Sequence, residues 1–96
     1  MDTVESPVAQ RQRVRVRGTV QGVGFRPFVW RLAHELGLDG WVLNDAEGVL
    51  AEVQGAPFAL AEFLRRVALD APPLARVDAV ENEARPLEPG EGFAIA

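Results

Sequence analysis

The residues best suited to chemistry lie in one short segment, Val20–Pro27, with the sequence VQGVGFRP. Its two glycines allow the backbone to curl so that successive N–H groups point to one side. The segment leads into an expected helix, whose first four amides lack helical partners and favour an anion. Arg26 adds a planar guanidinium that can bind two phosphate oxygens at once. We therefore expect a site for a phosphate group here, with an ordinary glycine-rich turn as the alternative.

The candidate phosphate-binding residues contribute backbone amides, and the arginine also contributes its side chain. They are Gln21, Gly22, Val23, Gly24, Phe25 and Arg26. At least one of the two glycines is expected to have a positive φ. All ten basic residues of the chain are arginines. The absence of lysine excludes a Schiff-base enzyme and a Walker A loop, so an anion must be bound by guanidinium or by backbone amides.

A strand before the loop and a helix after it must position these residues. Over residues 13–20, apolar or small side chains alternate with arginine or threonine, which predicts a strand with one buried face. Pro27 suits the first position of a helix, and apolar residues then recur every three or four positions as far as Leu36. Gly37 suits a left-handed cap that ends the helix.

The rest of the chain predicts a hairpin, a second helix and two more strands. The strands are expected at residues 40–44, 48–54 and 76–84, with the helix beginning at Pro57 and a last strand beginning at Phe93. This order predicts an α+β, ferredoxin-like (βαββαβ) two-layer sandwich, in which two helices cover one face of an antiparallel sheet. The arginines of the first strand are expected on the open face.

The domain organisation is expected to be simple. Residues 1–10 show no periodicity and are expected to be a flexible leader, and residues 11–96 are long enough for one domain. The last strand stops at the final residue of the chain. We therefore expect this domain to be a piece excised from a longer multidomain protein.

The composition argues against several classes of function. Ten basic and fourteen acidic residues give a net charge of −4, a poor match to nucleic acid. The chain has no cysteine, which excludes disulfides, thiolate zinc sites and iron–sulfur clusters and fits a cytoplasmic location. It has no apolar run of about 18 residues, so no membrane span is expected. We expect no cofactor, metal, nucleic acid or membrane as a partner of this domain.

Two motifs resemble those of the acylphosphatase family. The first is VQGVGFR at residues 20–26, and the second is GWVLN at residues 40–44 followed by the glycine and valine at 48 and 49. The resemblance covers about residues 12–96. It implies the ferredoxin-like fold and hydrolysis of carboxyl–phosphate mixed anhydrides. It further implies catalytic roles for Arg26, which would bind the phosphate with the loop amides, and for Asn44, which would orient the attacking water.

Three other segments resemble the N-terminal acylphosphatase-like domain of the HypF carbamoyltransferases. They are RPFV at residues 26–29, Asn44 with Asp45, and APPLARV at residues 71–77. This resemblance implies carbamoyl phosphate as the substrate, in the synthesis of the cyanide ligands of [NiFe]-hydrogenases. It also implies downstream domains of a parent chain as partners. The zinc-binding and nucleotide-using functions of such domains cannot be assigned to these 96 residues.

Two alternatives of other classes stay open. A non-catalytic module that binds carbamoyl phosphate, or docks a partner domain, would use the same arginine and loop amides. An RNA-binding domain of ferredoxin-like fold would use the open sheet face, but that face is expected to lack the aromatic pair that stacks bases. Phosphate or sulfate is the simplest anion with which to test the loop.

The remaining polar and aromatic residues have simpler interpretations. Trp41 is expected in the core, and His34, which cannot form a typical zinc site alone, is expected on an exposed helix face. Asp45 and Glu47 are expected to be solvated in the hairpin. The arginine row of the first strand is expected to be a solvated face. It consists of Arg11, Arg13, Arg15 and Arg17.

Overall fold

The computed structural model describes residues 8–96 and contains every element expected from the sequence. In chain order these are β1 (Gln10–Thr19), α1 (Phe25–Glu35), β2 (Asp39–Asp45), β3 (Gly48–Gly55), α2 (Pro57–Leu69), β4 (Arg76–Arg85) and β5 (Phe93–Ile95). Of the expected leader, residues 1–7 lie outside the described part, and residue 10 already belongs to β1. None of the helices in residues 8–96 is both long and apolar enough to cross a membrane.

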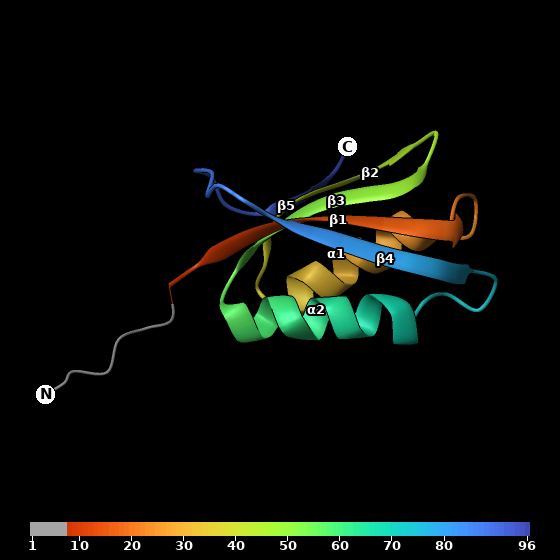
Figure 1. The fold of residues 1–96 in the computed structure, drawn as a ribbon, viewed down its shortest axis with the longest axis horizontal. Coiled ribbons are helices and arrows are strands. Elements are labelled where there is room, and N and C mark those ends of the chain that lie inside the picture. Colours follow the sequence, from red (N-terminus) through yellow and green to blue (C-terminus); the bar gives the residue numbers. More distant parts are fainter. Residues whose placement is uncertain (1–7) are drawn as a thin grey trace, which may run out of the picture.

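The five strands form one sheet in the order β4-β1-β3-β2-β5. β1 pairs antiparallel with β3 and β4, and β2 pairs antiparallel with β3. Both helices lie against the same face of this sheet (Figure 1). The expected ferredoxin-like α+β fold is therefore confirmed. The short last strand, β5, adds a parallel partner at the free edge of β2.

The core lies between the sheet and the helices. Val14 and Val16 of β1 are buried, whereas the arginines that alternate with them lie on the opposite face, as the period of two requires. Leu32 of α1 and Phe63 of α2 are also buried in the core. Burying a side chain of this size contributes about 1.5–3 kcal/mol, so the valines of β1 hold the strand that leads into the loop.

Helix α1 begins two residues earlier than the sequence predicts. Gly24 is its N-cap in the left-handed region, with φ of 80°, so Pro27 is the third residue of the helix instead of the first. The shift has a packing reason: Phe25 is buried and meets Phe28 edge to face, with ring centroids 5.4 Å apart. Proline is still tolerated there because its missing N–H lies in the unpaired first turn.

The end of α1 confirms the expected glycine cap. Gly37 has φ of 68°. Its N–H donates to the carbonyl of His34 at 3.2 Å, and the N–H of Leu38 donates to the carbonyl of Ala33 at 2.9 Å. These two bonds form a Schellman motif, which turns the chain directly into β2.

Candidate phosphate-binding site

The loop between β1 and α1 has a buried residue at each end and exposed glycines between them. Val20 and Phe25 are buried in the core, whereas Gly22 and Gly24 are exposed. Both glycines have positive φ, 74° and 80°, which confirms the expectation for this loop. A Cβ at either position would meet nothing within 4 Å. Backbone conformation, and not lack of space, therefore requires glycine here.

The start of α1 carries neither of the features that usually satisfy a helix N-terminus. Its N-cap, Gly24, offers no side chain to the unpaired amides, and its first turn contains no acidic residue. An uncapped helix start leaves several N–H donors and the positive end of the helix dipole available. This end of α1 is therefore suited to bind an anion.

Arg26 is the second residue of α1 and is half-buried. Within residues 8–96, its guanidinium makes no ion pair and no hydrogen bond with another side chain or with the backbone. Its position beside the uncapped amides places a free bidentate donor next to the anion-favouring helix start.

Asn44 lies near the end of β2, paired with Val49 of β3. Because side chains alternate along a strand, it shares the helix-covered face with Val42, which is fully buried. Its side-chain oxygen Oδ1 is buried and accepts no hydrogen bond. No other side-chain nitrogen or oxygen buried within residues 8–96 lacks a partner. An unpaired buried acceptor costs about 1–3 kcal/mol, so this atom is suited to a donor that arrives with a ligand.

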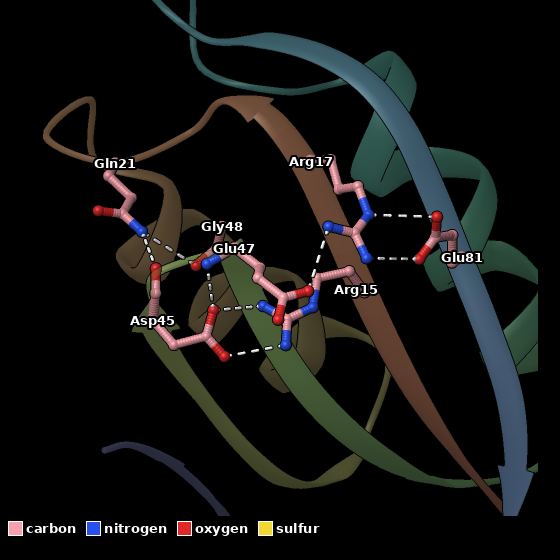
Figure 2. Close-up of polar contacts among 7 residues, drawn as sticks. All are labelled: Arg15, Arg17, Gln21, Asp45, Glu47, Gly48 and Glu81. Atoms are coloured by element: carbon pink, nitrogen blue, oxygen red, sulfur yellow. Dashed lines mark hydrogen bonds and ion pairs between the residues drawn. The ribbon is translucent and has the colours of Figure 1, made fainter.

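Gln21 connects the loop to the hairpin that carries Asn44. Its side-chain nitrogen Nε2 donates to the carbonyl oxygens of Asp45 and Gly48 (Figure 2). The loop and the β2–β3 turn therefore lie at the same end of the sheet, on the right in Figure 1. The sequence predicts only a backbone contribution from Gln21, because nothing in the sequence marks two carbonyl groups as partners of its side chain.

Asp45 is not a solvated hairpin residue, contrary to expectation. Its two carboxylate oxygens accept hydrogen bonds from the two terminal nitrogens of Arg15, and Oδ1 also accepts the N–H of Glu47 at 2.9 Å (Figure 2). The hydrogen bonds from Arg15 and from this N–H hold the pKa of Asp45 below its usual range. A carboxylate held in this way is a weak base.

The expectation of a solvated arginine row on β1 is wrong for Arg11 and Arg15, which lie largely out of solvent, whereas the side chains of Arg13 and Arg17 are 38% and 41% exposed. Arg11 is only 5% exposed, and its Nε donates to Glu52 at 2.7 Å, while Arg13 binds the other oxygen of the same carboxylate at 2.7 Å. Arg17 donates to Glu81 of β4 and to Glu47 of the β2–β3 turn, so Glu47 is an ion-pair partner in place of a purely solvated residue. Register explains the result, because β3 and β4 place carboxylates beside these arginines.

Two of these arginines bind the same carboxylate, that of Glu52. Burial acts to raise the pKa of Glu52, but the hydrogen bonds and charges of Arg11 and Arg13 together outweigh it and lower that pKa. The four arginines of β1 are therefore neutralised by carboxylates of this chain. A face of this kind does not offer free positive charge to RNA.

The expectation for Trp41 is wrong, and the expectation for His34 is confirmed. Trp41 is only half-buried and lies outside the core, because its neighbour Val42 takes the inward position on β2. His34 is exposed as expected and stacks on Trp30, with ring centroids 4.4 Å apart. In the described part of the chain, no group of three His, Cys, Asp or Glu side chains could hold a metal ion.

Comparison with known proteins gives two kinds of relative. A family model described as acylphosphatase matches residues 12–95. Carbamoyltransferase HypF2 of Cupriavidus necator is 57% identical over 91 residues, which are 94% of this chain and 11% of that protein. An acylphosphatase of Rhizorhabdus wittichii is 37% identical over 93 residues, which are 97% of this chain and 94% of that protein.

A solved structure of a HypF protein also matches this chain. The crystal structure of full-length HypF in the phosphate- and nucleotide-bound form matches with a TM-score of 0.92 at 32% identity, over 96% of this chain and 12% of that chain. This chain thus spans about a tenth of the HypF proteins that it matches and nearly the full length of the Rhizorhabdus acylphosphatase.

Proposed function

The chain belongs to the acylphosphatase family, and from this premise we propose that it binds an acyl phosphate at the loop between β1 and α1 and hydrolyses it. The amides of residues 21–26 and the guanidinium of Arg26 bind the phosphoryl oxygens. Asn44 orients the attacking water through its side-chain amide. The family model and the uncapped start of α1 beside Arg26 support this assignment.

One observation carries the proposal: the buried oxygen Oδ1 of Asn44 has no hydrogen-bond partner within residues 8–96. A water molecule held between this oxygen and a bound phosphoryl group would satisfy it. An amide is neutral and offers both a donor and an acceptor, so it suits orientation of water better than its deprotonation. A role for Asn44 in orienting water, without a nearby base, fits a site whose neighbouring carboxylate, Asp45, is already bound by Arg15.

The reaction needs little acid–base assistance. Water oxygen forms a bond to phosphorus while the bond between phosphorus and the acyl oxygen breaks, and the leaving group departs as a carboxylate or carbamate. A phosphoryl oxygen can accept the proton that water loses. Positioning and charge stabilisation account for most of the catalysis of phosphoryl transfer, and the loop amides with Arg26 supply both.

The substrate that we propose is carbamoyl phosphate. The chain is 57% identical to a HypF carbamoyltransferase and 37% identical to a free-standing acylphosphatase, which favours the former's chemistry. A matching HypF structure is described as phosphate-bound. We place the domain in a longer cytoplasmic carbamoyltransferase of hydrogenase maturation, where its partners would be the downstream domains.

Steady-state hydrolysis of acetyl phosphate and carbamoyl phosphate by the 96-residue chain tests this proposal. Asn44→Ala should lower kcat by about 100-fold and leave inhibition by inorganic phosphate nearly unchanged, because the interaction is made mainly in the transition state. Asn44→Asp should be at least as damaging, since a carboxylate repels the phosphoryl group. Asn82→Ala is the matched control, because Asn82 is an exposed residue of β4 whose side chain, within residues 8–96, donates only to Gln12.

Two outcomes would overturn parts of the proposal. If Asn44→Ala weakened phosphate inhibition as much as it lowered kcat, Asn44 would be a structural turn residue. If the wild-type chain bound phosphate without turnover of either substrate, the domain would be a binding module of a larger enzyme and not a hydrolase.

A further inference from the structure

The side chain of Gln21 holds the phosphate-binding loop against both strands of the β2–β3 hairpin (Figure 2). It donates to the carbonyl oxygen of Asp45, the last residue of β2, and to that of Gly48, the first residue of β3, at 3.1 Å for the latter. A carboxamide nitrogen has two hydrogens, and both are used here. The Gln21 side chain therefore binds the hairpin and has no donor left for a phosphate.

The hairpin is held from β1 as well. The guanidinium of Arg15 binds the Asp45 carboxylate with both terminal nitrogens, one of them at 2.9 Å. The same carboxylate closes the turn through the N–H of Glu47. A Cβ at Gly48 would collide with the carbonyl oxygen of Val16, so the start of β3 lies directly against β1.

These contacts converge on the residue that follows Asn44. Asp45 is held through its carbonyl group by Gln21 and through its carboxylate by Arg15. Because a peptide unit is planar and stiff, fixing the backbone of Asp45 also restricts the Cα position of Asn44. Gln21 belongs to the loop itself, so the same contacts set the distance between the loop and Asn44.

We propose that Arg15, Gln21 and Asp45 form a hairpin brace whose residues are positioning residues for hydrolysis. The brace holds Asn44 at the distance from the phosphate-binding loop that in-line attack by water requires. This inference rests on the proposed function, and it adds three residues that touch neither the water nor the phosphoryl group. A misplacement of about 1 Å can cost about 100-fold in rate, so the brace matters even though Gln21, one of its members, is exposed.

Two single variants test the brace on the wild-type background. Gln21→Met keeps the length of the side chain and removes both donors, and Arg15→Met removes the guanidinium fork. Each should lower kcat for acetyl phosphate by about tenfold, with inhibition by inorganic phosphate changed by less than about threefold. Arg65→Met is the control, because Arg65 makes a similar two-point pair with Glu62 on α2, outside the hairpin.

A double-mutant cycle with Asn44→Ala distinguishes a brace that acts through Asn44 from residues with a merely structural role. Because the brace acts through Asn44, adding Gln21→Met to Asn44→Ala should cost less than about twofold in kcat, compared with about tenfold on the wild-type background. If the two losses multiply fully, the brace proposal is wrong while the proposed function stands. If phosphate inhibition weakens in step with kcat in Gln21→Met, the side chain supports phosphate binding and the brace is again wrong. No turnover by the wild-type chain would overturn the proposed function and this inference with it.

Discussion

Arginine is used in two opposite ways in β1 and at the start of α1. The arginines of β1 lie in a sheet face where carboxylates of β2, β3, β4 and the β2–β3 turn neutralise them. Arg26 lies eleven positions after Arg15, on a helix whose first turn has no acidic residue, and it has no carboxylate partner within residues 8–96. The number of arginines therefore says little about anion binding. Arg31 of the same helix is also unpaired within residues 8–96 but is exposed and lies away from the helix start. The arginine available to a ligand is therefore identified by two features together, the lack of an internal counter-charge and a position beside the uncapped amides.

The largest expected effect concerns the paired arginines. Glu52→Gln should lower the free energy of unfolding by about 3 kcal/mol, because buried Arg11 would lose its close carboxylate partner and keep only that of Glu88, at 3.7 Å. Inhibition by inorganic phosphate should not change. Denaturant unfolding measures the first quantity, and Glu83→Gln, on the exposed edge strand of the same face, should change little. A loss of phosphate binding in Glu52→Gln would show that the two regions are not separate.

The pH dependence of the same variant follows from the lowered pKa of Glu52. A carboxyl whose pKa is lowered on folding stabilises the fold above its unfolded pKa, and this contribution is lost as the pH falls through the folded value. The stability difference between wild type and Glu52→Gln should therefore be full near neutral pH and shrink only below the ordinary carboxyl range. A difference that persisted unchanged at about pH 2 would mean that ionisation of Glu52 is not its source.

The next effect concerns the free arginine. Arg26→Ala should weaken binding of inorganic phosphate by about 100-fold, because two charge-assisted hydrogen bonds are lost. The unfolding midpoint should hardly change, since this side chain makes no internal ion pair within residues 8–96. Isothermal titration gives the affinity. Arg31→Ala on the exposed side of the same helix is the control and should bind like wild type; unchanged affinity in Arg26→Ala would remove the site.

A conservative change should separate charge from geometry at the same position. Arg26→Lys should leave phosphate affinity at least about tenfold below wild type, because one compact ammonium replaces a bidentate fork. The same titration measures it. Affinity equal to that of wild type would reduce the role of Arg26 to simple charge.

The smallest expected effect concerns the backbone of the loop. Gly22→Ala and Gly37→Ala should each cost about 1 kcal/mol in unfolding free energy, because both glycines have positive φ and open space around them. Only Gly22→Ala should also weaken phosphate binding, since Gly37 lies at the other end of α1. Denaturant unfolding and phosphate titration on both variants make the test, and equal phosphate affinity in the two would place the anion elsewhere.

Local sequence patterns predict most of the fold and the backbone of the site. Alternation in β1, the glycine cap at Gly37 and the turn at residues 45–48 are each encoded by neighbouring residues. The positive φ of Gly22 and Gly24 follows in the same way. The register between strands cannot be predicted in this way. The partners Arg11 and Glu52 are 41 residues apart, and no local pattern indicates that β3 brings them together.

Three further features could not be predicted, because each depends on tertiary packing or on contacts with main-chain groups. The inward position of Val42 puts Trp41 outside the core, and only the pairing of β2 decides which of the two faces the helices. The side chain of Gln21 binds main-chain carbonyl groups, which carry no sequence signal. The helix start at Phe25 depends on the packing of that ring against Phe28 and is equally non-obvious from propensity.

A crystal structure of the 96-residue chain with inorganic phosphate tests the central claim most directly. We predict phosphate at the start of α1, accepting hydrogen bonds from amides of residues 22–26 and from both arms of the Arg26 guanidinium at about 2.7–2.9 Å. A water molecule should lie between the phosphate and Asn44 Oδ1. Phosphate bound instead in the hollow of about 240 Å³ lined by Arg13, Arg15 and Arg17, with the loop empty, would contradict the account.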